Sequence, residues 1–138
     1  ILVRTRDSSA LLIDVINMRK KMRSQMLIAP NIDGFDLKQG EGGIVDIEFM
    51  VQYHILANAR TYPGLALYSD NIRQLEALSL VGCLSDADAD ALKAAYVRYR
   101  SLNHEAILAG RAGLIAAELV RDERRTVNRL WAQWMKYS

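Results

Sequence analysis

The sequence is poor in residues that cross-link or interrupt a chain. Its single cysteine, Cys83, rules out an internal disulfide and suits a reducing compartment such as the cytoplasm. Only 2 prolines and 8 glycines occur among 138 residues. No apolar run approaches the roughly 20 residues that cross a bilayer, so we expect neither a membrane span nor a secretory signal. These absences predict a cytoplasmic protein and exclude a disulfide-rich scaffold.

A large excess of one charge is also missing. The 18 Lys and Arg residues nearly balance the 16 Asp and Glu residues, which leaves a net charge of +2. This value is too small to favour nucleic acid or an anionic membrane as a partner. The length suits one domain, so we expect residues 1–138 to form a single helical domain. Because the sequence begins at Ile1 without a methionine, we interpret it as a piece of a larger chain.

Helical periodicity fills the long segments between the few prolines and glycines, and it predicts an all-α fold. We expect a helical bundle of about five to six helices with one Gly-rich loop. Pro30 should end the first helix, and an Asn31–Gly34 turn should follow it. Ser69 and Ser85 are expected helix N-caps, and Gly82 and Gly110 fall where helices should end. The clearest expected spans are Ser9–Ala29, a helix from Ile44, Ser69–Gly82, a long helix from Ser85, and a last helix to about Lys136.

The segment from Ile44 has apolar residues on two sides, which predicts a central helix buried on much of its circumference. One stripe includes Ile44 and Val51, and the other includes Phe49 and Leu56. The preceding residues Phe35–Lys38 are expected to be extended. In the first helix, methionines at helical spacing predict a face that belongs to the core or to an interdomain seam; they are Met18, Met22 and Met26.

Glycine is concentrated at one place, Gly40, Gly42 and Gly43. Glycine allows positive φ and close backbone approach, and a helix N-terminus offers unpaired N–H groups that suit phosphate. Lys38 lies just upstream and can add a positive charge. We therefore expect these glycines and Lys38 to bind the phosphate of a nucleotide. The spacing matches neither a Walker loop nor a dinucleotide-binding turn, so a purely structural connection remains the alternative.

Three carboxylates flank the glycines, namely Asp36, Asp46 and Glu48. On a helix, Asp46 and Glu48 point about 200° apart, so they cannot form an acid–base pair on one face. We interpret all three as residues that anchor the loop or contact a ligand. His54 and His104 lack the spacing of a zinc site, and we assign them to packing or to the surface. The sequence thus predicts no catalytic residue and no metal ligand in this chain.

Residues 36–49 also resemble a known family. The pattern Asp36-x-Lys38-x-Gly40-x-Gly42-Gly43-Ile44-x-Asp46-Ile47-Glu48-Phe49, with Gln52 after it, is similar to the signature that follows the nucleotidyltransferase domain in the glutamine synthetase adenylyltransferase family. The resemblance covers nearly the whole chain. Further similar segments are Met18–Met22, Ser69–Arg73, His104, and Trp131 with Trp134. A related glycine motif occurs in PII uridylyltransferases.

The resemblance implies a role in a bifunctional enzyme that adenylylates and deadenylylates glutamine synthetase. ATP and Mg²⁺ would bind mainly in a preceding nucleotidyltransferase domain, and AMP would pass to a tyrosine of the synthetase. This chain would be the C-terminal helical domain, inactive alone, that completes the nucleotide site and relays nitrogen status. Expected partners are the preceding domain, glutamine synthetase and the PII signal protein, without nucleic acid or membrane.

Two alternatives stay open. The chain could be a regulatory docking module for PII or glutamine synthetase in which the glycine loop is only structural. It could also be the helical part of a PII uridylyltransferase.

Overall fold

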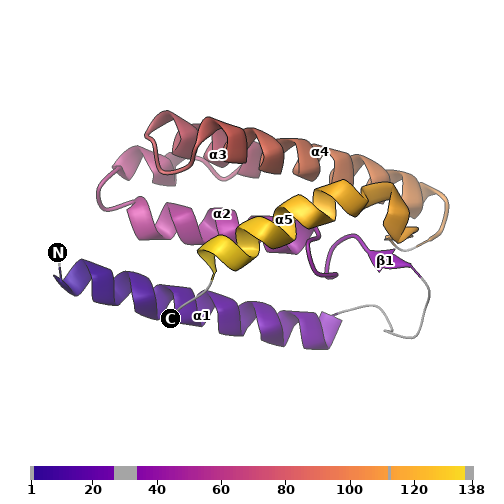
Figure 1. Ribbon diagram of the computed structural model, residues 1–138, viewed down its shortest axis with the longest axis horizontal. Helices are drawn as coiled ribbons and strands as arrows, with labels where there is room; N and C mark the ends of the chain where they lie inside the picture. Colours follow the sequence, from indigo (N-terminus) through magenta and orange to yellow (C-terminus); the bar gives the residue numbers. More distant parts are fainter. Residues whose placement is uncertain (1, 27–33, 112, 136–138) are drawn as a thin grey trace.

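The computed structural model describes residues 2–26, 34–111 and 113–135, with side chains described from residue 10 onward except Met26. This part of the chain is mostly helical, which confirms the predicted helical bundle (Figure 1). The five α-helices are α1 (Leu2–Met26), α2 (Ile44–Asn58), α3 (Asn71–Leu80), α4 (Asp86–Leu108) and α5 (Arg121–Trp134). The shorter elements are strands β1 (Phe35–Asp36) and β2 (Leu114–Ile115) and the 3-10 helices η1 (Pro63–Leu67) and η2 (Ala117–Val120). No described helix is apolar and long enough to cross a membrane.

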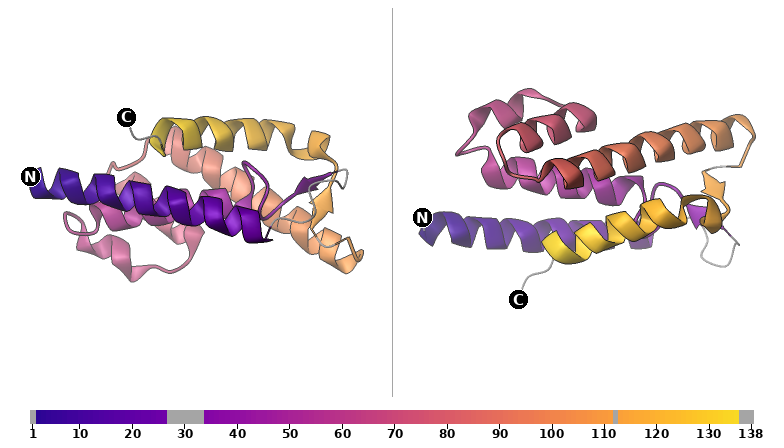
Figure 2. Two further views of the ribbon diagram at one scale, coloured as in Figure 1. Left: turned by 90° about the horizontal axis from the view of Figure 1, so that it is seen from below. Right: turned by 45° about the horizontal axis from the view of Figure 1, so that its top comes forward.

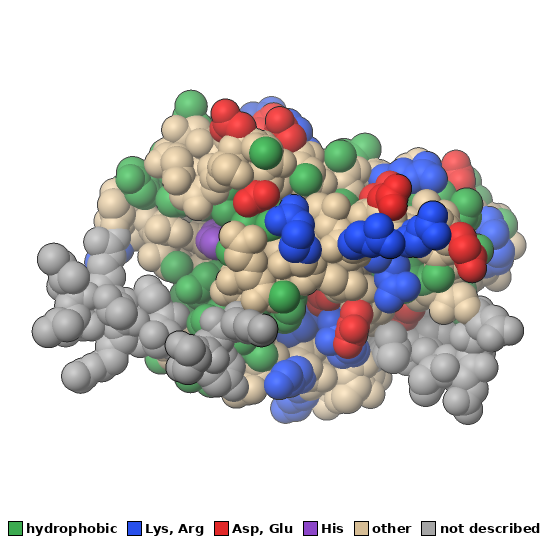
Figure 3. Space-filling model, viewed as in Figure 1, with side chains coloured by type: hydrophobic (Ala, Val, Ile, Leu, Met, Phe, Trp, Pro, Cys, Tyr) green, Lys and Arg blue, Asp and Glu red, His purple; other side chains and the backbone are tan. Residues whose placement is uncertain are grey.

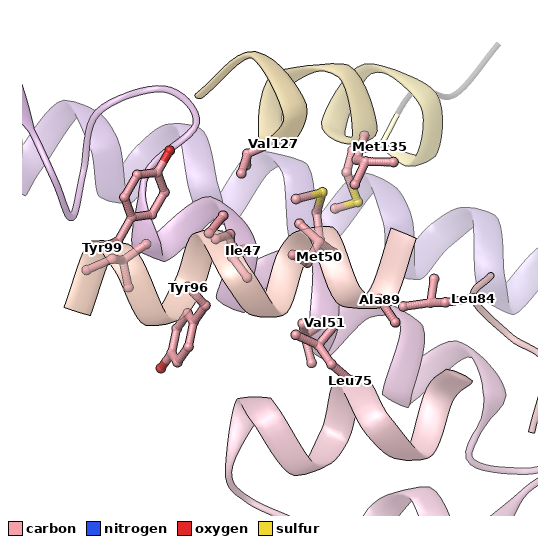
Figure 4. Close-up of a cluster of buried hydrophobic side chains, with 14 of the residues drawn as sticks. Ile47, Met50, Val51, Leu75, Leu84, Ala89, Tyr96, Tyr99, Val127 and Met135 are labelled. Carbon is pink, nitrogen blue, oxygen red and sulfur yellow. The ribbon is translucent and has the colours of Figure 1, made fainter. Parts of the chain in front are cut away.

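Helix α2 is the central element, as its two apolar sides predict. It contacts α1, α3, α4 and α5, and in the right-hand view of Figure 2 it lies between α3 and α4 above and α1 and α5 below. Ile47 and Met50 have no exposed surface, and Val51 is almost fully buried. Figure 4 shows Met50 pointing toward Met135 at the end of α5, and Val51 beside Leu75 of α3. One hydrophobic core therefore joins all five helices around α2.

Helix α1 does not use the predicted methionine stripe as its core face. Met18 is 62% exposed and Met22 is half-buried, while the side chain of Met26 lies outside the described residues. The buried face instead carries an arginine among aliphatic residues, and its members are Leu12, Val15, Ile16 and Arg19. The charged residue interrupts the apolar period, which explains why the sequence pattern did not place Arg19 on the buried face. The exposed Met18 excludes a core role for that residue, and an interdomain seam stays a prediction for the methionine stripe.

The helix ends confirm some predicted caps and correct one. The Ser85 hydroxyl accepts a hydrogen bond from Asp88 N at 3.1 Å, as expected for an N-cap. Helix α3 is capped by Asp70 rather than Ser69, since the Asp70 carboxylate accepts from Ile72 N and Arg73 N. Gly82 follows α3 with φ +81°, as a residue after a helix end often does.

One predicted helix boundary differs from the structure, and others lie outside the described residues. Helix α1 begins at Leu2 rather than Ser9. Its predicted end at Ala29, most of the Asn31–Gly34 turn, and Lys136 lie outside the described residues.

A two-residue strand pair fixes the segment that leads into the glycine loop. Strands β1 and β2 are antiparallel, with Phe35 opposite Ile115 and Asp36 opposite Leu114. The Leu37 amide continues the pairing by donating to Gly113 O at 3.1 Å. The predicted extended piece is therefore confirmed only for Phe35–Asp36. Its partner strand, which joins the loop to the segment before α5, was not predicted.

Candidate functional site

The glycine loop is closed by its own hydrogen bonds. Gly40 N donates to Asp36 O at 2.9 Å, and Gly43 N donates to Gly40 O at 3.0 Å. Gly42 N donates to the Asp46 carboxylate at 2.7 Å. All three glycine amides expected to face a phosphate are thus already bonded within the chain. The open cradle of unpaired amides that the sequence suggested does not exist in the described loop 34–43, and phosphate could reach these amides only after the loop rearranged.

The two aspartates of the motif hold this closed conformation. Asp36 Oδ1 accepts hydrogen bonds from Lys38 N and Gln39 N, each at 3.0 Å, which turns the chain directly after β1. Asp46 is 2% exposed, and its Oδ2 atom receives the Gly42 amide. Both carboxylates therefore make loop-anchoring contacts in this structure.

Asp46 also binds two arginines of α1. Arg19 Nε donates to Asp46 Oδ1 at 2.5 Å, and Arg23 Nη2 lies 2.8 and 3.0 Å from the two carboxylate oxygens. Arg19 is fully buried, and its Nη1 and Nη2 atoms donate to Gln39 Oε1 and Gln39 O at 2.8 and 2.9 Å. We call this group the clasp; it consists of Arg19, Arg23, Gln39, Gly42 and Asp46. The clasp joins α1 to the loop through charge-assisted bonds in a water-excluded position.

Packing explains why the loop needs glycine. A Cβ on Gly40 would lie 2.5 Å from a ring carbon of Phe35, and one on Gly43 would lie 2.5 Å from Leu37 O. Gly42 has φ +82°, which side chains rarely adopt, and its added Cβ would lie 3.0 Å from Asn128 Oδ1. The glycines therefore have a structural explanation that requires no ligand.

Glu48 belongs to a different cluster on another side of α2. Burial raises the pKa of its carboxyl, while a hydrogen bond from Tyr96 and the charges of Lys38, Arg100 and Arg19 act in the opposite direction. The Tyr96 hydroxyl also accepts from Asn71 Nδ2 at 3.2 Å. In Figure 4 this hydroxyl points away from the hydrophobic cluster. The separation of Glu48 from Asp46 agrees with their predicted 200° offset on the helix.

Two exposed cations accompany Glu48. The Lys38 side chain lies at the outer rim of the loop, and the Arg100 guanidinium lies 5.7 Å from the centre of the Tyr96 ring. Both influence the same half-buried carboxyl, although one comes from the loop and the other from α4. The sequence offered no signal that would join Arg100 to the motif, because long-range contacts between helices leave no local pattern. An anion that approached this rim would meet side-chain charges rather than free amides.

The other residues singled out by the sequence take packing or surface positions. The His54 ring meets Trp134 edge-on at 4.7 Å between ring centres, and burial lowers the pKa of His54 to about 4. His104 is exposed and Cys83 is half-buried. Within the described ranges, no three His, Cys, Asp or Glu side chains come together as a set that could hold a metal ion.

The basic residues of α5 lie on the outside of the bundle, and blue side chains gather over this helix in Figure 3. One of them also supports the loop. The Arg124 guanidinium lies 4.1 Å from the centre of the Phe35 ring, and its Nε donates to Glu41 O at 3.2 Å. Arg124 of this exposed helix surface therefore connects α5 to the loop.

Comparison with known proteins identifies the family. The family described as GlnD PII-uridylyltransferase matches residues 15–133, which include the clasp, the glycine loop and Trp131 of α5. The chain belongs to this family. Family membership accounts for the shared glycine motif, which the sequence resemblance had placed in both adenylyltransferases and uridylyltransferases.

The individual relatives are adenylyltransferases, as the sequence resemblance predicted. It is 44% identical over 144 residues to a bifunctional glutamine synthetase adenylyltransferase/adenylyl-removing enzyme of Pseudomonas syringae pv. tomato, and 40% identical over 144 residues to that of Pseudomonas aeruginosa. The Acinetobacter baylyi enzyme of the same name is 42% identical over 134 residues. These matches cover 95–96% of this chain but only 14–15% of each relative.

Proposed function

We propose that this chain is a helical domain of a bifunctional glutamine synthetase adenylyltransferase/adenylyl-removing enzyme. The observation that carries this proposal is the 44% identity to such an enzyme over 96% of the chain. The whole enzyme would transfer AMP from ATP to a tyrosine of glutamine synthetase and also remove it. In this proposal the domain works in the cytoplasm, follows a nucleotidyltransferase domain and has no transferase activity alone.

The domain's own contribution would be to hold the charged side chain at the outer edge of the glycine loop in a fixed position. The clasp fixes α1 against the loop, and the glycines give the loop its tight turn. This arrangement presents the exposed Lys38 side chain, with Arg100 near the same carboxyl of Glu48. We assign Lys38, supported by Arg100, to the phosphates of a nucleotide bound in the preceding domain. Gly40, Gly42 and Gly43 would act through the shape of the loop.

Magnesium would be held elsewhere in the enzyme. The residues described here do not provide a metal-binding set of carboxylates, histidines or cysteine. We therefore place ATP and Mg²⁺ in the preceding domain. The PII signal protein is a further proposed partner, through which this domain would relay nitrogen status.

The full-length enzyme with Lys38→Ala tests the nucleotide assignment. Loss of one charge-assisted phosphate contact, about 1.5–3 kcal/mol, should raise the KM for ATP by at least about tenfold. Lys21→Ala is the matched control, because Lys21 is an exposed lysine on α1. An unchanged KM for ATP in the Lys38 variant would contradict the assignment. Appreciable AMP transfer by the 138-residue chain alone would contradict the inactive-domain proposal.

One alternative has support from the loop itself. Because the glycine amides bond internally, the loop could be purely structural in a module that docks PII or glutamine synthetase. Lys38→Ala would then leave ATP kinetics unchanged while the response to PII is lost. The uridylyltransferase alternative predicts instead that the full-length protein transfers UMP from UTP to PII.

A further inference from the structure

A series of hydrogen bonds runs from α3 through α4 to Glu48 of α2. Asn71 Nδ2 donates to the Tyr96 hydroxyl at 3.2 Å, and this hydroxyl donates to the Glu48 carboxylate. Tyr96 is 6% exposed, while Asn71 and Glu48 are half-buried. Both bonds point toward the carboxylate, so they strengthen one another and favour its ionised form. Three helices therefore fix the carboxylate of Glu48 in one place.

The fixed carboxylate faces two cations from different elements. Burial raises the pKa of Glu48, whereas the Tyr96 hydrogen bond and then the charges of Lys38 and Arg100 act to lower it. Lys38 and Arg100 are both exposed, and the Arg100 guanidinium lies 5.7 Å from the centre of the Tyr96 ring. Two like charges on flexible side chains repel each other, and a carboxylate near both of them offsets this repulsion.

Lys38 has a fixed backbone and a side chain with free donors. Its amide donates to Asp36 Oδ1 at 3.0 Å, and its carbonyl accepts from Val45 N at 3.1 Å. Among the described residues, no carboxylate lies within 4 Å of the Lys38 ammonium group, so Glu48 attracts it over a longer range. A lysine side chain loses much conformational entropy when it is ordered, and a nearby fixed charge reduces that cost.

We propose that Glu48 is a positioning residue for Lys38. Its carboxylate, held by Tyr96, keeps the Lys38 ammonium group on the side of the loop that faces α4, near Arg100. This inference rests on the proposed function, in which Lys38 contacts the phosphates of ATP. Because the ammonium group keeps its three N–H donors, a phosphate group can bond to it while Glu48 stays in place. Glu48 itself does not touch the nucleotide.

The full-length enzyme with Glu48→Gln tests this role. Glutamine keeps an acceptor for Tyr96 but removes the charge, and we expect the KM for ATP to rise by about fivefold, the upper end of what one exposed ion pair contributes. The double variant with Lys38→Ala should have the KM of Lys38→Ala alone, because Glu48 acts only through Lys38. Glu76→Gln is the matched control, since this exposed carboxylate also faces a lysine, with Lys93 Nζ 3.1 Å away.

Three kinetic results would overturn the positioning role. In the first, Glu48→Gln leaves the KM for ATP unchanged although Lys38→Ala raises it. In the second, Glu48→Gln lowers the KM, which would mean that the carboxylate competes with phosphate for the lysine. In the third, Glu48→Gln raises the KM further in the Lys38→Ala background, which would mean that Glu48 acts independently of Lys38.

A titration separates failure of this proposal from failure of the proposed function. Carbon-13 NMR follows the Glu48 carboxyl in the 138-residue chain without nucleotide. Lys38→Met and Tyr96→Phe should each raise the pKa of Glu48, since each removes a group that favours the ionised carboxylate, whereas Lys93→Met should not change it. If Lys38→Ala leaves the KM for ATP unchanged, the phosphate assignment fails, and the titration still decides whether Glu48 holds Lys38. A pKa of Glu48 that stays the same in Lys38→Met would overturn the positioning role.

Discussion

Arg19 of α1 and Asp46 of α2 form a buried ion pair across 27 positions of sequence, with Nε 2.5 Å from Oδ1. Neither partner is exposed to an appreciable extent, and each makes further hydrogen bonds within the clasp. Burying two charges costs desolvation energy, which is offset only when the geometry is good and the remaining donors and acceptors are bonded. Here the arginine is bonded at all three nitrogens, so the pair fixes the position of α1.

Removing one partner of the clasp should destabilise the domain strongly. Asp46→Ala leaves Arg19 buried without its counter-charge, and we expect a loss of about 3–5 kcal/mol in the free energy of unfolding. The measurement is urea unfolding at neutral pH. Asp14→Ala is the control, since Asp14 is exposed on α1, and it should change stability by less than about 0.5 kcal/mol. Equal effects of the two substitutions would argue against the clasp.

Substitution of a loop glycine by alanine should destabilise the domain much more than the same substitution at a glycine elsewhere. Gly43→Ala brings a Cβ within 2.5 Å of Leu37 O and should cost more than about 2 kcal/mol. Gly64→Ala places its Cβ in open space, and it should be neutral or stabilise by up to about 1 kcal/mol. Thermal unfolding of both variants without nucleotide checks this. A tolerated Gly43→Ala would show that close packing does not explain the motif.

His54 should make stability depend on pH below neutrality. Burial lowers its folded-state pKa from the usual 6.5 to about 4, so the unfolded chain binds more protons between these values. This contribution to stability is present above pH 6.5 and is lost as the pH falls toward 4, by about 3 kcal/mol in total. Urea midpoints from pH 4 to pH 7.5 measure it.

The matching variants separate this histidine from the other titrating groups. His54→Phe keeps an aromatic ring against Trp134 and should flatten the pH profile relative to wild type. His104→Gln should leave the profile unchanged, because His104 is exposed. A His54→Phe profile parallel to that of the wild type would mean that the imidazole is accessible to protons in the folded state.

The cap of α3 offers a test of a single residue position. Asp70→Ala should cost about 1 kcal/mol, because two amides of the first turn lose their acceptor. Ser69→Ala should have almost no effect, although sequence reasoning favoured that residue. Ser85→Ala on α4 should again cost about 1 kcal/mol. Thermal unfolding should therefore show similar losses of stability for Asp70→Ala and Ser85→Ala. A larger loss for Ser69→Ala than for Asp70→Ala would contradict the assignment of the cap.

Sequence reasoning succeeded where the signal is local and repeated. The two apolar sides of the segment from Ile44 predicted a central helix, and Ser85 with Gly82 marked helix ends. It failed where one residue departs from the apolar periodicity of a helix or where two neighbouring residues are equally good caps. Arg19 is a charged residue in a buried position, so the apolar pattern of α1 did not include it in the core face. Asp70 and Ser69 are both good cap residues, and only the path of the chain decides between them.

Contacts between distant segments explain the remaining failures. The strand pair of Phe35 with Ile115 involves too few residues to leave a periodic pattern. The glycine motif has a composition that suits both a phosphate loop and a tightly packed turn, and the difference lies in Asp46, Leu37 and the helix α1 that meets them. The motif residues of the loop could be named from sequence, whereas Arg19, Arg23 and Arg100 and the partners of the glycine amides could not.

Hydrogen exchange of the loop amides, followed by NMR on the 138-residue chain without nucleotide, tests the closed clasp most directly. The account predicts that the amides of Gly40, Gly42 and Gly43 exchange at least about 100-fold more slowly than in an unstructured peptide, and that Asp46→Asn removes most of the protection at Gly42. Rapid exchange in the free chain, with protection gained only when ATP or inorganic phosphate is added, would contradict it and restore the open cradle.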